Sequence, residues 1–398
     1  MKRLEEIQEI SGKVFFPTYN RYAAAMTRGE GAYLFDTEGR RYLDFLSGIG
    51  VASLGHGHPA LAEAVCEQAK RLTHVSNLYF MPPQTELAAR LTEAASLDRV
   101  FFCNSGAEAN EAAIKLARKY AREKYGEGRH EIITLEDSFH GRTLATVSAT
   151  GQAKVKEGFA PLLEGFIHVP AGDIDALRRA VTDKTCAVML EPILGEGGVV
   201  VLPDAYLQTV RKLCSERDIL FVVDEIQVGM GRTGKLFAHQ WAGIEPDVMT
   251  LAKAMGGGLP LGAMLAREKY ADVLAAGSHG STFGGNPVAC RAGLVVMDHV
   301  ADGSFLDHVV EMGELIHARF NGMAARFGFI EEVRGRGLIV GVKLSVPCKE
   351  IVARAFEKGL LVNCTQESVL RMLPPLIISE KEVEEMVEIL SDIFKDTV

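Results

Sequence analysis

The sequence predicts an α/β fold, with a large domain built on a mostly parallel sheet and a smaller α+β domain beside it. From about residue 60 to 300, amphipathic helical stretches alternate with short apolar runs rich in β-branched and aromatic residues, which is typical of strand–helix–strand units. Outside that region, the pattern changes to shorter strand-like pieces between helices. The length of 398 residues also exceeds what one hydrophobic core usually supports.

The short apolar runs are expected to form the strands of the large sheet. They occupy 99–103, 131–135, 185–190, 219–223, 247–251 and 261–265. The run 219–223 does not alternate apolar with polar residues, so both of its faces should be covered by helices. We therefore place this run at the centre of the sheet.

The smaller domain is expected to draw on both ends of the chain. After the large domain, the pattern predicts strands at 330–333, 338–344, 360–363 and 369–372, and helices at 305–327, 348–358 and 379–395. We expect residues 1–55 to contribute to the small domain, 56–304 to form the large one and 305–398 to complete the small one.

The composition indicates small-molecule partners. Lys and Arg total 43 against 52 Asp and Glu, for a net charge of −9, and neither sign forms a long block, so no nucleic-acid or anionic-membrane surface is indicated. Residues 1–6 carry no apolar leader pattern, and no stretch offers about 18 uninterrupted apolar residues. We expect a cytoplasmic protein that binds neither nucleic acid nor membrane.

Cysteine and histidine spacing predicts neither disulfides nor a metal site. The seven cysteines are scattered, odd in number and without a C-x-x-C pair, so they are expected to be reduced packing residues. His56 and His58 lie in a Gly-His-Gly-His-Pro segment with no Cys, Asp or Glu at metal-ligand spacing. That segment is interpreted as a loop.

The first segment that suggests chemistry follows the run 99–103 and opens a helix expected to reach about residue 124. Ser105 and Glu108 have the spacing of a capping box, which alone would explain them. Ser-Gly-Ala at a helix N-terminus also presents backbone N–H groups and a positive dipole end, which suit a phosphate. Taken alone, the cap is the better interpretation.

The second is Asp224-Glu225, at the C-terminal end of the run 219–223. Carboxylates there are costly unless paired, and ligands bind at the carboxyl ends of strands in open parallel sheets. A cationic ligand group, such as a protonated pyridine nitrogen, would satisfy an acid at this place. A structural ion pair or a helix cap is the alternative.

The third is Lys253, which follows the run 247–251 and precedes Gly-Gly-Gly at 256–258. A lysine that forms a Schiff base needs a depressed pKa and a desolvated place, and glycines let the backbone approach a ligand closely. A surface lysine before a flexible turn is the alternative. These residues alone do not favour one interpretation over the other.

One further motif, Gly229-Met-Gly231-Arg-Thr-Gly234, matches the dinucleotide-binding pattern G-x-G-x-x-G. Its context is unsuitable, because Asp224 and Glu225 would repel a pyrophosphate and the segment from Lys235 to Trp241 is a poor start for the required helix. A nicotinamide-dependent oxidoreductase therefore stays a remote alternative.

Five segments together resemble the class III aminotransferases, which depend on pyridoxal 5'-phosphate (PLP), and most closely the acetylornithine aminotransferases. They are Ser-Gly-Ala-Glu-Ala-Asn-Glu (105–111), Glu-Pro-Ile-Leu-Gly-Glu-Gly-Gly (191–198), Asp-Glu-Ile-Gln (224–227), Leu-Ala-Lys (251–253) and Ser-Thr-Phe-Gly-Gly-Asn-Pro (281–287). Each is weak alone, but five in family order are specific.

The resemblance implies a fold-type I homodimer with active sites shared between the subunits. Lys253 would hold PLP as a Schiff base and act as acid and base in the proton shift. Asp224 would keep the pyridine nitrogen protonated, and Gln227 would donate to the ring oxygen. Phe139, for which the residue type alone favours a core position, would stack on the ring.

The resemblance also assigns the phosphate and substrate contacts. Ser105, Gly106 and Ala107 would bind the phosphate, and Thr282 would reach it from the other subunit, with Ser281 beside it contacting substrate. Arg142 would bind the substrate α-carboxylate bidentately. Arg371 would bind the second carboxylate of 2-oxoglutarate, and Glu196 would neutralise Arg371 when the donor presents an amine instead.

The function implied is transfer of the terminal amino group of N2-acetyl-L-ornithine to 2-oxoglutarate, a step of arginine biosynthesis. Succinylornithine, ornithine, succinyl-diaminopimelate or 4-aminobutyrate are alternative donors that the motifs do not separate. A catalytically silent binding protein on the same fold is a third possibility, against which Lys253, Asp224 and Arg142 speak together.

Overall fold

Seven strands form the large sheet, in the order β4-β12-β11-β10-β7-β5-β6. The structure is a computed structural model and describes residues 3–397. The strands are β4 (Arg99–Cys103), β5 (Glu131–Leu135), β6 (Phe166–Val169), β7 (Thr185–Leu190), β10 (Leu220–Asp224), β11 (Val248–Leu251) and β12 (Gly262–Ala266). Only β12 runs antiparallel to its neighbours in this sheet. The predicted α/β fold with a mostly parallel sheet is confirmed, with β6 as the strand that the sequence pattern missed.

The strand β10 lies at the centre of the sheet, as predicted. Leu220 and Val222 pack with α5 (Gly106–Tyr125), whereas Phe221 and Val223 pack on the other face with α8 (Asp204–Arg217). Because side chains alternate along a strand, covering both faces requires apolar residues at consecutive positions. The other helices around this sheet are α3 (Pro59–Arg71), α4 (Pro82–Ala95), α6 (Leu144–Ala149), α7 (Ile174–Ala180) and α9 (Pro287–Val300).

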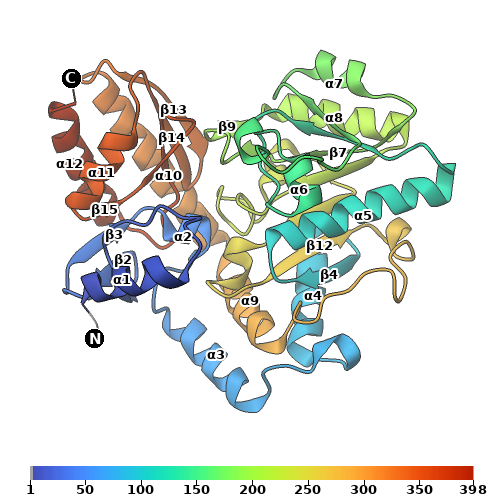
Figure 1. Ribbon diagram of the computed structural model, residues 1–398, viewed down its shortest axis with the longest axis horizontal. Coiled ribbons are helices and arrows are strands. Elements are labelled where there is room, and N and C mark those ends of the chain that lie inside the picture. The colour runs from blue at the N-terminus through green and yellow to red at the C-terminus, as the bar shows by residue number, and fades with distance from the viewer. Residues whose placement is uncertain (1–2, 398) are drawn as a thin grey trace.

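Two smaller sheets lie to one side of the large one, where the blue N-terminal strands meet the red C-terminal helices (Figure 1). One sheet has the order β1-β2-β3-β15 and the other β13-β14-β17-β16. Their strands are β1 (Met26–Glu30), β2 (Tyr33–Asp36), β3 (Arg41–Asp44), β13 (Ile330–Arg336), β14 (Ile339–Leu344), β15 (Leu360–Leu361), β16 (Asn363–Thr365) and β17 (Val369–Met372). The accompanying helices are α1 (Leu4–Val14), α2 (Ser47–Gly50), α10 (Gly303–Ala324), α11 (Lys349–Glu357) and α12 (Glu380–Lys395). A separate hairpin joins β8 (Ile193–Leu194) and β9 (Val200–Val201).

The segment predicted as one strand, 360–363, is two strands in different sheets. Leu360 and Leu361 pair with β3, and from Asn363 onwards the chain pairs with β17 instead. Asn363 is thereby the direct cross-strand partner of Arg371. A period-2 pattern cannot show such a change of partner, since the same alternation suits both sheets.

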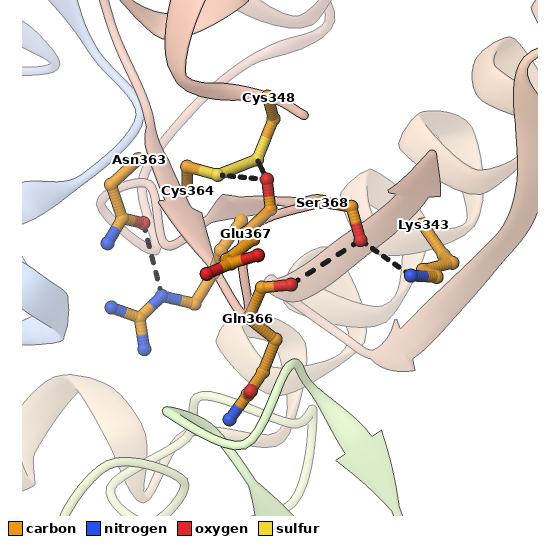
Figure 2. Close-up of a disulfide and its surroundings, with 8 residues drawn as sticks. Lys343, Cys348, Asn363, Cys364, Gln366, Glu367 and Ser368 are labelled. Atoms are coloured by element: carbon orange, nitrogen blue, oxygen red, sulfur yellow. Dashed lines mark hydrogen bonds between the residues drawn. A yellow bond between two sulfur atoms is a disulfide. The ribbon is translucent and has the colours of Figure 1, made fainter. Parts of the chain in front are cut away.

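Cys348 and Cys364 form a disulfide, which corrects the prediction that all cysteines are reduced (Figure 2). Cys348 precedes α11 and Cys364 lies in β16, and their Cα atoms are 5.7 Å apart. The pairing is tertiary: sixteen residues of separation carry no local signal, and only the packing of α11 beside β16 brings the thiols together. The remaining cysteines are free, and all but Cys66 are buried.

No helix within residues 3–397 is long and apolar enough to cross a membrane.

Candidate active site

A cavity of about 460 Å³ opens where the carboxyl ends of β4, β7, β10 and β11 meet. The residues that follow these strand ends form its walls, as expected for an open parallel sheet. The predicted site residues that line it are Ser105, Gly106, Ala107, Phe139, Arg142, Glu196, Asp224, Gln227 and Lys253. Segments more than a hundred residues apart in sequence therefore converge on one chamber.

Lys253 begins the short turn η4 (Lys253–Gly256) directly after β11 and lines the cavity. Burial lowers its pKa to about 8, against an opposing effect of the Glu196 charge. Its backbone has φ +43°, a left-handed conformation that costs a residue other than glycine about 1–3 kcal/mol. Such strain persists where the surrounding structure fixes the backbone, often at functional sites. At Lys253 this backbone conformation places an amine with a lowered pKa at the cavity.

The helix α5 presents its N-terminus to the same cavity. Ser105 Oγ accepts a hydrogen bond from Glu108 N at 3.2 Å, so the Ser105 cap is present. Glu108 Oε2 accepts from Asn104 N at 2.7 Å instead of from Ser105 N, so the reciprocal bond of the predicted capping box is shifted by one residue. The cap leaves the first N–H groups of the helix, at Gly106 and Ala107, without partners inside the helix. A Cβ at Gly106 would lie 2.8 Å from the Ile226 side chain, so this position requires glycine. The cap therefore leaves these N–H groups available for an anion.

Asp224 is held by polar groups that the sequence analysis did not identify. Its Oδ2 accepts from Asn110 Nδ2 at 2.7 Å and lies 2.8 Å from His140 Nδ1, while Ile226 N donates to Oδ1 at 3.0 Å. Thr250 Oγ1 in turn donates to Asn110 Oδ1 at 2.8 Å. These bonds fix the carboxylate while one side of it still faces the cavity.

His140 and Glu191 are two further buried titratable residues beside Asp224. Burial opposes protonation of His140, but the hydrogen bond and charge of Asp224 outweigh it, so the pKa of His140 is raised. Burial raises the pKa of Glu191 to about 7, even though Phe139 N donates to it at 2.9 Å. The sequence around Asn110 is explained by a helix cap, and His140 belongs to no recognisable pattern, so only the fold reveals their contacts with Asp224.

Arg371 does not line the cavity but lies directly behind Glu196. Its side chain is 1 % exposed, and its Nη1 is 2.6 Å from Glu196 Oε1. The same Nη1 donates to Gln227 Oε1 at 3.2 Å, and Gln227 Nε2 donates to Glu196 at 3.2 Å. Burial alone would raise the pKa of Glu196, but the charge and hydrogen bond of Arg371, together with the Lys253 charge and the Gln227 hydrogen bond, outweigh it and lower the pKa. The pairing of Glu196 with Arg371 that the sequence analysis expected is present.

Arg142 stands at the exposed side of the cavity. Its guanidinium carbon is 5.5 Å from the centroid of the Phe139 ring. Arg142 and Glu196 also line a second, larger cavity of about 1050 Å³, which reaches Cys364 and Gln366. The two cavities therefore share a wall at Arg142, expected to bind a carboxylate, and at Glu196, expected to neutralise Arg371.

Thr282 and Ser281 lie outside the cavity of their own chain. Thr282 is exposed, and its carbonyl accepts from Ser76 Oγ at 3.2 Å. Ser281 Oγ accepts from Asn104 Nδ2 at 3.2 Å, next to Ser105. The expected contact of Thr282 with another subunit's site stays a prediction.

The motif Gly229–Gly234 is a set of turns that packs against α10 and joins no helix N-terminus. Gly234 has φ +83°, and a Cβ there would lie 2.3 Å from Val310, so backbone conformation and packing together explain that glycine. Arg232 is fully buried and donates to the carbonyls of Leu338 and Pro374. Within the described part of the chain, no group of three or more His, Cys, Asp or Glu side chains could hold a metal ion.

Comparison with known proteins gives a consistent result over the whole chain. Residues 16–394 match the family described as Aminotransferase class-III. The acetylornithine aminotransferase of Caldanaerobacter subterraneus is 50% identical over 385 residues, covering 96% of this chain and 98% of that protein. The crystal structure of N-acetylornithine aminotransferase from Stenotrophomonas maltophilia is 37% identical with a TM-score of 0.85, and covers 98% of both chains. The ornithine aminotransferase from Toxoplasma gondii is 32% identical with a TM-score of 0.95, and covers 100% of this chain and 96% of that one.

Proposed function

The chain belongs to the class-III aminotransferases, and from this premise we propose that it moves the terminal amino group of N2-acetyl-L-ornithine to 2-oxoglutarate with PLP as cofactor. Curated acetylornithine aminotransferases match nearly the full chain at higher identity than the ornithine aminotransferase does. This difference favours acetylornithine over ornithine as donor. A nicotinamide-dependent oxidoreductase and a silent binding protein have no support.

The cavity residues fit a phosphorylated pyridine aldehyde. The N-terminus of α5 at Gly106 and Ala107 lines the cavity and offers N–H groups to a phosphate, and Ile226 packs against the side of Gly106 where a Cβ would stand. Asp224 offers a fixed carboxylate to the ring nitrogen, and Phe139 a ring for stacking. Lys253 provides the amine. When bound, PLP supplies an electron sink for the negative charge that develops on the substrate carbon.

The chain's own residues then divide the work. Lys253 would hold the cofactor through Nζ and would move the proton between the reacting carbons, for which a pKa of about 8 is well matched near neutral pH. Asp224, kept in place by Asn110 and His140, maintains the proton on the ring nitrogen. Gln227, which lines the cavity and donates to Glu196, would donate to the ring oxygen instead when the cofactor is bound.

Arg142 and Arg371 bind the carboxylates of the substrates in this proposal. Arg142 binds the carboxylate common to both substrates. With the amine donor in place, Glu196 stays on Arg371 and cancels its charge, at the 2.6 Å distance observed. With 2-oxoglutarate, Glu196 moves away and Arg371 binds the second carboxylate. A single cavity thus accepts two substrates of different charge in turn.

A second copy of the chain is proposed to complete the site. Thr282 lies beside an exposed apolar surface formed by Leu78, Tyr79, Phe80 and Phe283, in which Phe80 is fully exposed. Apolar groups so exposed are typical of an interface. Covering this surface with a second copy would bring Thr282, and Ser281 with it, to the other subunit's cofactor. Sedimentation equilibrium should then give twice the mass of one chain, and a monomer that is fully active would contradict the shared site.

The observation that carries the proposal is the meeting of strained Lys253 with Asp224 and Glu196 in one chamber, with Arg371 bonded to Glu196 behind its wall. Borohydride treatment of the yellow holoenzyme, followed by peptide mapping, should place the label on Lys253. Half-reactions with acetylornithine, succinylornithine, ornithine and 4-aminobutyrate, followed by loss of the cofactor absorbance band, should be fastest with acetylornithine. A label elsewhere would refute the role of Lys253, and a faster reaction with another donor would replace acetylornithine.

A further inference from the structure

Asn363 contacts Nε of the Arg371 guanidinium, whereas Glu196 contacts Nη1. The two residues are cross-strand partners in β16 and β17, and Arg371 Nε donates to Asn363 Oδ1 at 3.1 Å. Because a guanidinium only donates, the amide oxygen of Asn363 must face Arg371 and the amide nitrogen must face away. The contact therefore has one polarity.

The partners of Arg371 differ in charge and in permanence. Nη1 has three acceptors: Gly195 O at 3.1 Å, Gln227 Oε1 at 3.2 Å and Glu196 Oε1 at 2.6 Å. Glu196 is the charged one, and it has to leave for a substrate carboxylate to bind. Asn363 holds Nε, on another edge of the guanidinium plane, so its bond is unaffected when Glu196 leaves.

The support beneath Asn363 is rigid. Cys364, the next residue, is joined to Cys348 by the disulfide, and Glu367 O accepts from Cys348 N at 2.9 Å. Figure 2 shows Asn363 beside this cross-link. A fixed acceptor on a short strand holds a guanidinium in one plane, which bidentate binding of a carboxylate requires.

We propose that Asn363 is a positioning residue that orients Arg371 for the second carboxylate of the oxo acid without cancelling its charge. The inference rests on the role given to Arg371 under the proposed function. A neutral amide accepts the Nε bond and leaves the positive charge available to substrate. A carboxylate at the same place would act as a permanent counter-ion, which Glu196 is not because it can move.

Asn363→Asp in the holoenzyme tests this idea because it keeps the size and the acceptor and changes only the charge. We expect kcat/KM for the 2-oxoglutarate half-reaction to fall by about tenfold or more, as the strength of charge-assisted pairing implies, while the acetylornithine half-reaction stays within about twofold. Asn321→Asp, at an exposed position in α10, is the matched control and should change neither. Glu196→Ala should give the opposite pattern, with the larger loss in the amine half-reaction.

A binding measurement separates orientation from chemistry. Calorimetry should show glutarate, a dicarboxylate without a reacting group, binding about tenfold more weakly to Asn363→Asp, while pentanoate, with one carboxylate, binds as to wild type. Asn363→Ala, which frees Nε without adding charge, should shift glutarate in the same direction by a smaller factor. Asn363→Ala provides the same test if Asn363→Asp does not fold.

Equal losses in both half-reactions would show that Asn363 acts only on folding and would overturn the proposal. Unchanged glutarate affinity in both variants would overturn it as well. If acetylornithine gives no half-reaction while glutamate and 2-oxoglutarate respond as above, the donor assignment fails and the role of Asn363 stands.

Discussion

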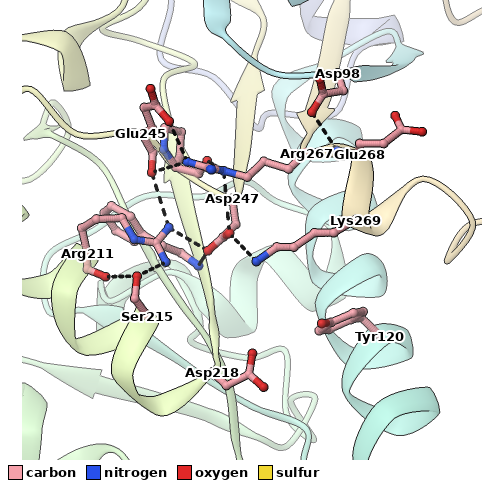
Figure 3. Close-up of polar contacts among 12 residues, drawn as sticks. Asp98, Tyr120, Arg211, Ser215, Asp218, Glu245, Asp247, Arg267, Glu268 and Lys269 are labelled. Atoms are coloured by element: carbon pink, nitrogen blue, oxygen red, sulfur yellow. Dashed lines mark hydrogen bonds and ion pairs between the residues drawn. The ribbon is translucent and has the colours of Figure 1, made fainter.

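Asp224 and Asp247 are buried carboxylates at opposite ends of the central strands; the two sides of the large sheet where these strands end and begin are called its edges below. The two negative charges are compensated in different ways. Asp224 ends β10 at the carboxyl edge, where it contacts the amide of Asn110 and the ring of His140. Asp247 precedes β11 at the opposite edge, where Arg211 Nη1 is 2.7 Å and Lys269 Nζ 3.0 Å away, and Phe221 N donates to it at 2.9 Å (Figure 3).

The difference separates a binding carboxylate from a structural one. Burial would raise the pKa of Asp247, but the Arg211 charge and the hydrogen bonds outweigh it, so its pKa is lowered. Its charge is satisfied within the protein. Asp224 has two uncharged donors, Asn110 Nδ2 and Ile226 N, beside His140, and it has an open side towards the cavity, which we propose is available to a cationic ligand. We therefore propose that one edge of the sheet serves binding, whereas the other serves stability.

The largest expected effect comes from Asp224→Asn. It keeps the shape of the side chain but removes the charge offered to the cofactor ring, so kcat/KM should fall on the order of 10²–10³-fold, as for loss of a preorganised electrostatic group. Steady-state kinetics measures this loss. Urea unfolding should show a change in the free energy of unfolding that is smaller than the loss of transition-state stabilisation. If the variant keeps wild-type activity, Asp224 is structural after all.

The reciprocal change, Asp247→Asn, should reverse the balance. It leaves the surrounding cations without their shared anion, so the free energy of unfolding should fall by about 3 kcal/mol. Because Asp247 lies at the edge remote from the cavity, kcat at a temperature well below unfolding should stay within about twofold. A folded Asp247→Asn protein with greatly reduced kcat would show that the two edges are not independent.

The next effect concerns the pH dependence of stability at the binding edge. The pKa of Lys253 is lowered to about 8 from 10.5, so the folded state binds fewer protons than the unfolded state between these values. Burying the charged amine therefore costs up to about 3 kcal/mol below pH 8, and this cost disappears as pH rises towards 10.5. In cofactor-free protein, Lys253→Met should be more stable than wild type at pH 7 and equal to it near pH 10.5. A difference that does not depend on pH would show that Lys253 is not desolvated.

The sequence predicts the elements of this comparison better than their contacts. The strands at 131–135 and 185–190 match β5 and β7 because local apolar runs determine them. Lys253 could be proposed from its strand and glycines, and Glu196 with Arg371 from the resemblance. Asn110 and His140 could not, since each gains its role only when separate strand ends converge on Asp224. The Cys348–Cys364 bond and the change of sheet at residue 362 depend on packing in the same way.

The smallest expected effect is that of Lys269→Met at the stability edge. The Lys269 side chain is 52% exposed, so water screens its attraction to Asp247, and its loss should lower the free energy of unfolding by less than about 1 kcal/mol. Arg211 is 18% exposed and the closer of the two, so Arg211→Met should cost more. Urea unfolding of both variants at two salt concentrations checks the order, and only the Lys269 contribution should shrink markedly with salt. An equal cost for both would mean that the Asp247 cluster acts as one unit, and its stability could then not be assigned to the buried pair.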